Sequence, residues 1–453
     1  MMKKLLLGST ALVVGGLVAA PAMAADPIKM GVGGYYQFYA LAGSMEGTYA
    51  TNGTWSQFKG IQFIQEGEIH FIGQTKLDNG TSIGVRVELE GWNPSISGTG
   101  VRQIDEAYLF AFGDWGRIEF GSKDDAAYIM YYGAPSALLG FGFFQHNSSF
   151  SWTNPTANGF NKAAFHISDQ TIDGQFQDVN RINYYTPRFA GLQIGVGYAP
   201  KINLSSTAAG GQALAANQVN LAGTCGYNDA TTANGCPTAD YAWQDALAIG
   251  ANYLNKFGDF SVAAYVAYSY ASFVPGYQPL ASAANTITGA NLSSWKQFVA
   301  GLQFSAFGFT LGGSYTWDNN GLGSNYYTGQ NNDTNSFAVG LMYETGPWQV
   351  SVGAAVARNN NGNGSLTVTN CGLSAACTVT TPATTAIAFG GNPQAGALQF
   401  GSETASKIEV GANYALGPGV KMIGGLIFNN LSGPSNAVAA QSWAALLGMD
   451  FRF

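Results

Sequence analysis

The residue types that usually carry catalysis are scarce in this sequence and are not spaced for it. None of the three histidines in the 453-residue chain, His70, His146 and His166, belongs to an HExxH pair. No GxxxxGK[ST] phosphate loop occurs, and no Ser/His/Asp group has the sequence context of a hydrolase family. We therefore expect no enzyme activity, no catalytic residue, no metal site and no cofactor.

One weak metal signal lies in the links rich in Asp and Asn. Asn331-Asn332-Asp333 could offer oxygen ligands to Ca²⁺ in an external loop. Stretches of this kind are more often ordinary loops, so calcium stays the less favoured of two interpretations.

The four cysteines lie in two close pairs, and each pair sits in a stretch rich in Gly, Ala, Asn and Thr. Cys225 and Cys236 form one pair, and Cys371 and Cys377 form the other. Four cysteines allow three connectivities, of which the two local pairs are the simplest. Because no histidine lies near either pair, zinc is disfavoured. We predict two disulfides that close loops.

The composition excludes several classes of protein. Charged residues make up 10% of the chain, against about 25% in ordinary soluble domains. Aromatic residues reach 13% and glycines number 61, while the mean hydropathy is only +0.04. Plentiful aromatic residues disfavour disorder. Because only one long apolar stretch occurs, at the N-terminus, a helical membrane protein is excluded as well.

That N-terminal stretch reads as a secretory signal peptide over residues 1–24. Lys3 and Lys4 precede an apolar run, and Ala22-Met23-Ala24 gives a small-residue cleavage site. The alternative is an N-terminal membrane anchor, but the apolar core is short for one. Cleavage removes two lysines and no acid, so the net charge moves from −7 to −9. We expect an exported protein that matures in an oxidising compartment.

Most of the remaining charge follows a period of two along predicted strands. Alternate residues of a strand point to opposite faces, and a charge facing lipid at mid-membrane costs roughly 2–4 kcal/mol for Arg or Lys. The strand faces that carry charged residues are therefore expected to line a lumen. The residues on these faces are Glu66, Glu68, His70, Arg86, Glu88, Glu90, Arg117, Glu119, Arg181, Lys407 and Glu409. Glu106 is the exception, because it shares its parity with Tyr108, Phe110 and Phe112. We place Glu106 near the rim or at a subunit contact.

The same alternation recurs in sixteen segments. They lie near 30–41, 60–77, 81–92, 102–113, 116–122, 178–187, 191–199, 243–256, 259–271, 295–306, 308–318, 334–345, 347–358, 405–416, 419–430 and 441–453. Short turns alternate with longer links, which is the layout of an outer-membrane barrel. Because lipid satisfies no backbone group, a spanning sheet must close on itself. A soluble β-sandwich would need polar outward faces. We predict an all-β, 16-stranded antiparallel transmembrane barrel over residues 25–453.

Several short motifs make the chain resemble a general porin of Gram-negative bacteria. They are Asp105-Glu106-Ala107-Tyr108-Leu109, the stretch from Gly113-Asp114-Trp115-Gly116 to Gly121, Asn183-Tyr184-Tyr185-Thr186-Pro187, and the terminal Phe451-Arg452-Phe453. In such porins an aromatic last residue is part of the barrel-insertion signal, and Phe453 matches it. Porins of this kind often carry arginine where this chain has Asp105 and Glu106.

The resemblance implies a homotrimer in the cell outer membrane of a Gram-negative bacterium. The third long link, about 123–177, is expected to fold inward and narrow the lumen. Acids on this loop would then face bases on the wall. Candidates for the constriction are Arg86, Arg117 and Arg181 on the wall, and Asp124, Asp125, Asp169 and Asp173 on the loop. The other expected partners are outer-membrane lipid and lipopolysaccharide, the barrel-assembly machinery and small hydrophilic solutes, with no nucleic acid.

The function expected from these observations is passive diffusion of ions and small hydrophilic solutes through a water-filled pore. The net charge of −9 predicts a mild cation preference. One alternative is a channel selective for solutes such as sugars, with a slide of loop aromatics: Tyr131, Tyr132, Phe141, Phe143 and Phe144. A structural or adhesive barrel without an open lumen is the less favoured alternative.

Overall fold

The fold was analysed in a computed structural model of the chain. It describes residues 27–49, 58–91, 104–143, 167, 179–202, 243–273, 290–319, 321–325, 331, 333–362, 368–369, 387–388, 401–432 and 438–453. The predicted signal peptide and all four cysteines lie outside these residues. No helix within the described ranges is long and apolar enough to cross a membrane.

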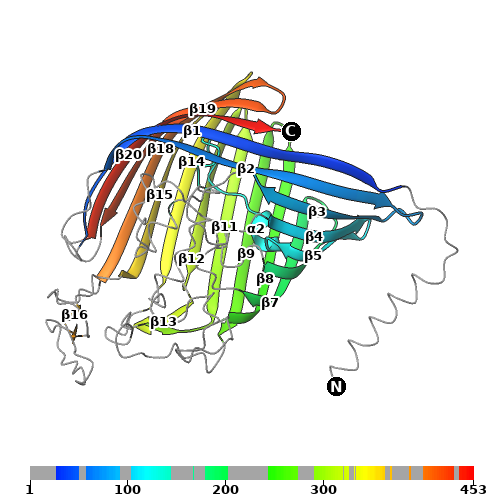
Figure 1. Ribbon diagram of the computed structural model, residues 1–453, viewed down its shortest axis with the longest axis horizontal. Coiled ribbons are helices and arrows are strands. Elements are labelled where there is room, and N and C mark those ends of the chain that lie inside the picture. Colours follow the sequence, from blue (N-terminus) through cyan, green and yellow to red (C-terminus); the bar gives the residue numbers. More distant parts are fainter. Residues whose placement is uncertain are drawn as a thin grey trace.

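Sixteen strands form one closed antiparallel barrel, in which each strand pairs with its neighbours in chain order (Figure 1). Pairing between the first and last strands closes the sheet. The strands are β1 (Lys29–Tyr49), β2 (Phe58–Lys76), β3 (Ser82–Glu90), β4 (Ile104–Gly113), β5 (Gly116–Lys123), β6 (Val179–Tyr185), β7 (Leu192–Ile202), β8 (Trp243–Phe257), β9 (Phe260–Phe273), β11 (Trp295–Ala306), β12 (Phe309–Asp318), β14 (Thr334–Thr345), β15 (Trp348–Gly362), β18 (Gly401–Gly417), β19 (Val420–Ser432) and β20 (Val438–Arg452). All sixteen predicted segments are thus confirmed as barrel strands.

Short turns connect the strands at one end of the barrel and longer links at the other. The turn between β4 and β5, for example, consists of Asp114 and Trp115 alone. The longer links carry the small paired strands β10 (Ala290–Leu292) and β13 (Leu322–Asn325), and β16 (Val368–Thr369) and β17 (Ile387–Ala388). In Figure 1, β13 and β16 lie at the end of the barrel away from the C-terminus. The C-terminus itself is fixed to β1, since Phe453 and Gly34 exchange two backbone hydrogen bonds of 2.9 and 3.1 Å.

The two faces of the sheet separate apolar from polar side chains. Large apolar residues cover the outside, for example Phe63, Leu109, Phe304 and Val352, all of which are exposed. The residues that alternate with them along each strand face inward and include the charged and small residues. The placement of Glu106 at a subunit contact is wrong, because Glu106 is 3% exposed and faces inward, although it does lie close to one end of β4. Its inward position is stabilised by Lys123, whose Nζ lies 2.7 Å from both carboxylate oxygens.

The first part of the long link after β5 lies inside the barrel. It contains the short helix α2 (Ala126–Ile129), which contacts β6, β7, β8 and β9. We call Ala126–Phe143 the strap. The strap follows the inner wall so closely that several inward positions must be glycine. A β-carbon on Gly301 of β11 would lie 1.7 Å from the Tyr132 carbonyl oxygen, and one on Gly340 of β14 would lie 2.4 Å from that of Pro135.

The buried apolar residues of the protein lie mainly between the strap and this wall. One cluster joins Ala126, Ala127 and Met130 of the strap to inward residues of β6 to β11. A second joins Leu138 and Phe141 to β1, β2, β19 and β20. Small residues on the inward face of β8, such as Ala246, Ala248 and Gly250, leave the room that the strap occupies. The buried apolar residues therefore form a layer between the strap and the barrel wall, along one side of the lumen.

Candidate functional site

The strap is held by hydrogen bonds from inward side chains to its backbone. Tyr265 donates to the Ala127 carbonyl at 2.5 Å, Asn252 to Met130 at 3.2 Å, and Gln303 to Gly133 at 2.7 Å. Further along, Asn413 donates to the Ala137 carbonyl and Ser351 Oγ accepts from the Ala137 N–H, at 3.0 and 2.8 Å. Tyr39 donates to Leu139 at 2.7 Å. These bonds satisfy five carbonyl groups and one N–H of the strap backbone on the side that packs against the wall.

A buried lysine holds the far end of the strap. The Lys407 side chain is 1% exposed, and its Nζ donates to the carbonyl oxygens of Phe141 and Gly142. Glu409 lies 3.2 Å from the same Nζ, and the Phe143 ring centroid lies 5.0 Å from it. Both charges were predicted to face the lumen. The structure places them inward but beneath the strap, where they stabilise its position.

The near end of the strap is fixed at Asp124 and Asp125. The Asp125 side chain caps α2 by accepting from the Tyr128 N–H at 2.7 Å, and it lies 3.7 Å from Arg181. Burial raises the pKa of the Asp125 carboxyl, while Arg181 and the helix N–H groups oppose this rise. Burial and the Glu106 carboxylate raise the pKa of Asp124 well above its ordinary value. Asn183 ties Asp124 to the wall by donating to its carbonyl oxygen at 2.7 Å.

Arg181 and Asp125 therefore meet as a buried pair, 5% and 0% exposed, where the strap leaves the wall. The expectation of loop acids facing wall bases across the lumen is wrong for these two residues. The reason is that the link turns directly onto the wall after β5, so its first acids stay beside β4 and β6. Asp169 and Asp173 lie outside the described residues. The strap itself contributes no charge, since residues 126–143 contain no Asp, Glu, Lys, Arg or His.

The wall formed by β2 to β5 carries charges of both signs, paired along or between strands. Arg86 pairs with Glu88 at 2.5 Å, and Arg117 pairs with Glu119 at 2.6 Å. In both pairs the arginine is the more exposed partner, with 30% against 7% and 35% against 5% of the side chains accessible. Glu66 and Glu90 also lie on the inward parity and are partly buried. The wall thus presents guanidinium groups to the lumen over carboxylates set deeper.

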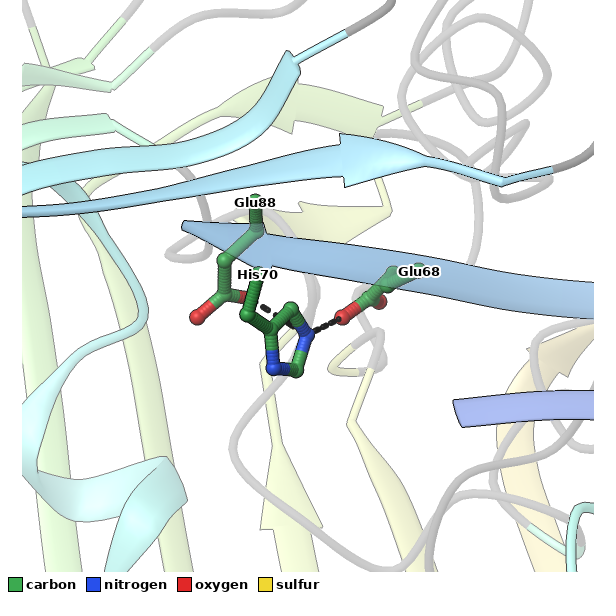
Figure 2. Close-up of side chains that lie close together, drawn as sticks. All are labelled: Glu68, His70 and Glu88. Carbon is green, nitrogen blue, oxygen red and sulfur yellow. Dashed lines mark hydrogen bonds and ion pairs between the residues drawn. The ribbon is translucent and has the colours of Figure 1, made fainter. Parts of the chain in front are cut away.

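Glu68, His70 and Glu88 converge at one point of this wall (Figure 2). His70 Nε2 lies 2.8 Å from Glu68 and 3.8 Å from Glu88, and the three possible ligand atoms lie within 4.8 Å of one another. Arg86 Nη2, however, lies 2.8 Å from His70 Nδ1. Because a guanidinium only donates, Nδ1 must accept, and the ring proton then sits on Nε2 and points to Glu68. Such a nitrogen has no lone pair for a metal ion, so this arrangement favours a hydrogen-bonded cluster over a metal site.

The aromatic residues proposed for a slide are placed differently from one another. Phe141 and Phe143 are buried, 3% and 0% exposed, and Phe141 packs edge-on against Tyr39. Tyr131 packs against Tyr265, with ring centroids 5.5 Å apart. Tyr132 is partly exposed, and Phe144 lies outside the described residues. A continuous slide along the strap is therefore not formed by the described members of this set.

The aromatic residues that share the parity of Glu106 form a row inside the barrel. Tyr108, Phe110 and Phe112 of β4 face inward, with neighbouring ring centroids 6.3 and 6.2 Å apart. The hairpin register could have shown this. The two-residue turn sets Phe112 opposite Arg117, and directly opposed residues share a face of the sheet.

The Asn331–Asp333 stretch, for which calcium was the less favoured interpretation, is only partly described. The Asp333 carboxylate accepts from the Trp317 indole at 3.1 Å. Asn332 lies outside the described residues, so calcium remains the less favoured interpretation of this stretch.

Comparison with known proteins agrees with this architecture. A family model for Gram-negative porins matches residues 8–307 and 256–445. No curated protein matches the chain. Among solved structures, an outer membrane protein of Vibrio cholerae, OmpT lacking its loop L8, has a TM-score of 0.50 at 11% identity, over 94% of this chain and 99% of that one. An anion-selective porin from Comamonas acidovorans gives 0.49 at 14% identity, over 94% and 100%. The first of these structures, at a TM-score of 0.50, supports the fold alone.

A closed sixteen-stranded barrel leaves no unpaired sheet edge in lipid, and its interior is wide enough for an aqueous channel. The matched family covers most of the chain. The chain belongs to the Gram-negative porin family and is a β-barrel channel protein of the outer membrane.

Proposed function

We propose that this porin is a passive, water-filled channel for ions and small hydrophilic solutes. The observation that carries the proposal is the charged inner wall of β2 to β5, on which the Arg86 and Arg117 side chains are 30% and 35% exposed. A barrel of sixteen strands has room for both an aqueous passage and an inward loop. The test is planar-bilayer recording with the purified full chain in KCl. We expect discrete conductance steps, and a protein that inserts without steps would refute the proposal.

The proposed channel is general in its solutes and mildly selective for cations. Support comes from the net charge of −9 after removal of the signal peptide and from wall acids such as Glu66 and Glu90 in excess of wall bases. Reversal potentials in a KCl gradient test the ion preference, and anion preference would contradict it. Flux of neutral sugars that rises linearly with concentration is expected; saturation with one sugar would instead favour a substrate-selective channel.

The proposed assembly is a homotrimer, as membership of the porin family suggests. Conductance steps that arrive in threes, together with a trimer mass in mild detergent, are the expected results. Single steps from a monomeric species would refute the trimer while leaving the channel intact.

A further inference from the structure

The inner wall contains an aromatic surface that a purely polar pore does not need. The interior of a porin barrel is normally polar because it is filled with water. Here Phe112 is partly exposed on the inward face of β4 and stacks on Phe110, with 25° between the ring planes. Further apolar surface inside the barrel comes from the uncharged strap, where Ile129 is 43% exposed.

Arg117 lies directly on this aromatic surface. Its guanidinium carbon is 4.8 Å from the Phe110 ring centroid and 5.8 Å from that of Phe112. Its Nε donates to Glu119 Oε1 at 2.6 Å. Within the described part of the chain, the two Nη nitrogens have no hydrogen-bond partner. The guanidinium is therefore held through Nε and through one face, while its Nη edge stays open to the lumen.

The group that holds Arg117 is itself fixed. Glu119 is 4% exposed, and its second oxygen lies 3.4 Å from Asn183 Nδ2. The same nitrogen donates to the Asp124 carbonyl oxygen, which belongs to the start of the long link. Arg117 is thus oriented by a chain of contacts that runs from the wall to the base of the strap. An oriented guanidinium loses little freedom when it binds an anion, so its contacts favour binding.

From this geometry we infer that Arg117, Phe110 and Phe112 form a lumenal site for small carboxylates that carry an aromatic or other apolar body. The carboxylate would accept from the two Nη nitrogens in one plane, and its apolar body would lie along Phe112. A planar monoanion fits this fork. It is also repelled less by the surrounding glutamates than a dianionic phosphate monoester would be. The inference rests on the proposed channel function and names a solute class for it.

The site is compatible with cation preference for small ions. Inorganic ions respond to the average field of the wall, whereas an aromatic carboxylate also gains short-range contacts with the open Nη edge and the ring. The experiment therefore uses current block by an organic solute in addition to ion selectivity. The probe is 3-phenylpropionate, added to the full-length channel in KCl. Acetate matches its carboxylate, and phenethylammonium matches its ring.

We expect 3-phenylpropionate to reduce the current reversibly, with half-block at a concentration at least about tenfold lower than for acetate or phenethylammonium. R117Q is expected to raise the half-block concentration about tenfold, because a hydrogen-bonded charge is lost. R117K keeps the charge without the planar fork and should also weaken the block. F112S should weaken the block by 3-phenylpropionate but leave that by acetate unchanged.

Arg452 offers a matched control. It pairs with Asp450, two residues away on β20, at 3.0 Å, as Arg117 pairs with Glu119. Among the described residues, no aromatic ring lies under its guanidinium. R452Q should therefore leave the block unchanged. Equal half-block by all three probes, or equal weakening by R117Q and R452Q, would overturn the inference while KCl conductance still supports the channel. Absence of conductance in the unaltered protein would refute both.

Discussion

Replacing Gly301 by alanine tests whether the strap position depends on close contact with the barrel wall. A β-carbon there would lie 1.7 Å from the Tyr132 carbonyl oxygen, whereas ordinary contact begins at 3.4 Å. The oxygen belongs to backbone and cannot rotate away, and Gly301 lies in the middle of β11 between two paired strands. The strap must therefore move by about 1.7 Å toward the lumen at this point.

This movement has an energetic cost as well as a functional one. The hydrogen bond from Gln303 to the Gly133 carbonyl, 2.7 Å long, lies next to the clash and would be stretched beyond its useful range. Loss of one such bond costs about 1 kcal/mol. The remaining anchors at Tyr39, Asn413 and Lys407 would keep the rest of the strap in place. We therefore expect a locally displaced strap and a narrower passage.

The assay is single-channel conductance in KCl, combined with thermal unfolding followed by circular dichroism. G301A should lower the unit conductance and reduce stability by about 1 kcal/mol or more. The control is G31A, because a β-carbon on Gly31 would meet nothing within 4 Å. Both substitutions reduce the freedom of the unfolded chain in the same way, so their difference isolates the strap. A G301A channel with the conductance and stability of G31A would refute the reasoning.

Three further substitutions address the anchors of the strap. K407M leaves Glu409 buried without its lysine and should lower the free energy of unfolding by about 3–5 kcal/mol, whereas the K407M/E409L double variant should recover part of that loss in thermal unfolding. D125A should destabilise the protein by about 1 kcal/mol more than D125N in the same assay, because asparagine caps a helix as well as aspartate does. E106Q removes a charge from the partner of Lys123, and we expect lower thermal stability with unchanged conductance, because the pair is buried against the wall; lower conductance in E106Q would show that Glu106 lines the passage.

Period-two alternation was sufficient to predict the barrel, because each strand must separate a lipid-facing side from a lumenal side. It failed on β4, where the inward positions are Tyr108, Phe110 and Phe112 and the outward positions include Ala107 and Ala111. On this strand the aromatic side chains are inside, whereas Leu109 is the large apolar residue outside. A rule that places the more apolar face of a strand toward lipid therefore predicts the wrong orientation for β4. The charge of Glu106 on that same face was the one sign against the rule.

The anchoring of the strap could not be predicted from sequence for a different reason. Gly301 and Gly340 are far from Lys407 and Asn413 in the chain, and each of the four alone is an ordinary inward residue. Their common role appears only once the barrel closes and the strap crosses the three strands that carry them, β11, β14 and β18. Their side chains, or the lack of one, are matched to one specific backbone path rather than to any local propensity.

The pairing of wall charges determines how far their field extends. Glu119 lies 2.6 Å from Arg117, and Glu88 lies 2.5 Å from Arg86, so each pair acts on a distant ion as a small dipole. A dipole field falls off faster than that of a single charge, and salt screens it further. The ion preference should therefore depend on the overall excess of acids over bases on this wall more than on the arginines. At contact distance the arginines matter more than the acids, because a solute meets the exposed guanidinium before the carboxylate beneath it. A paired arginine on this wall can thus contribute little to ion selectivity and still decide which organic anions are retained.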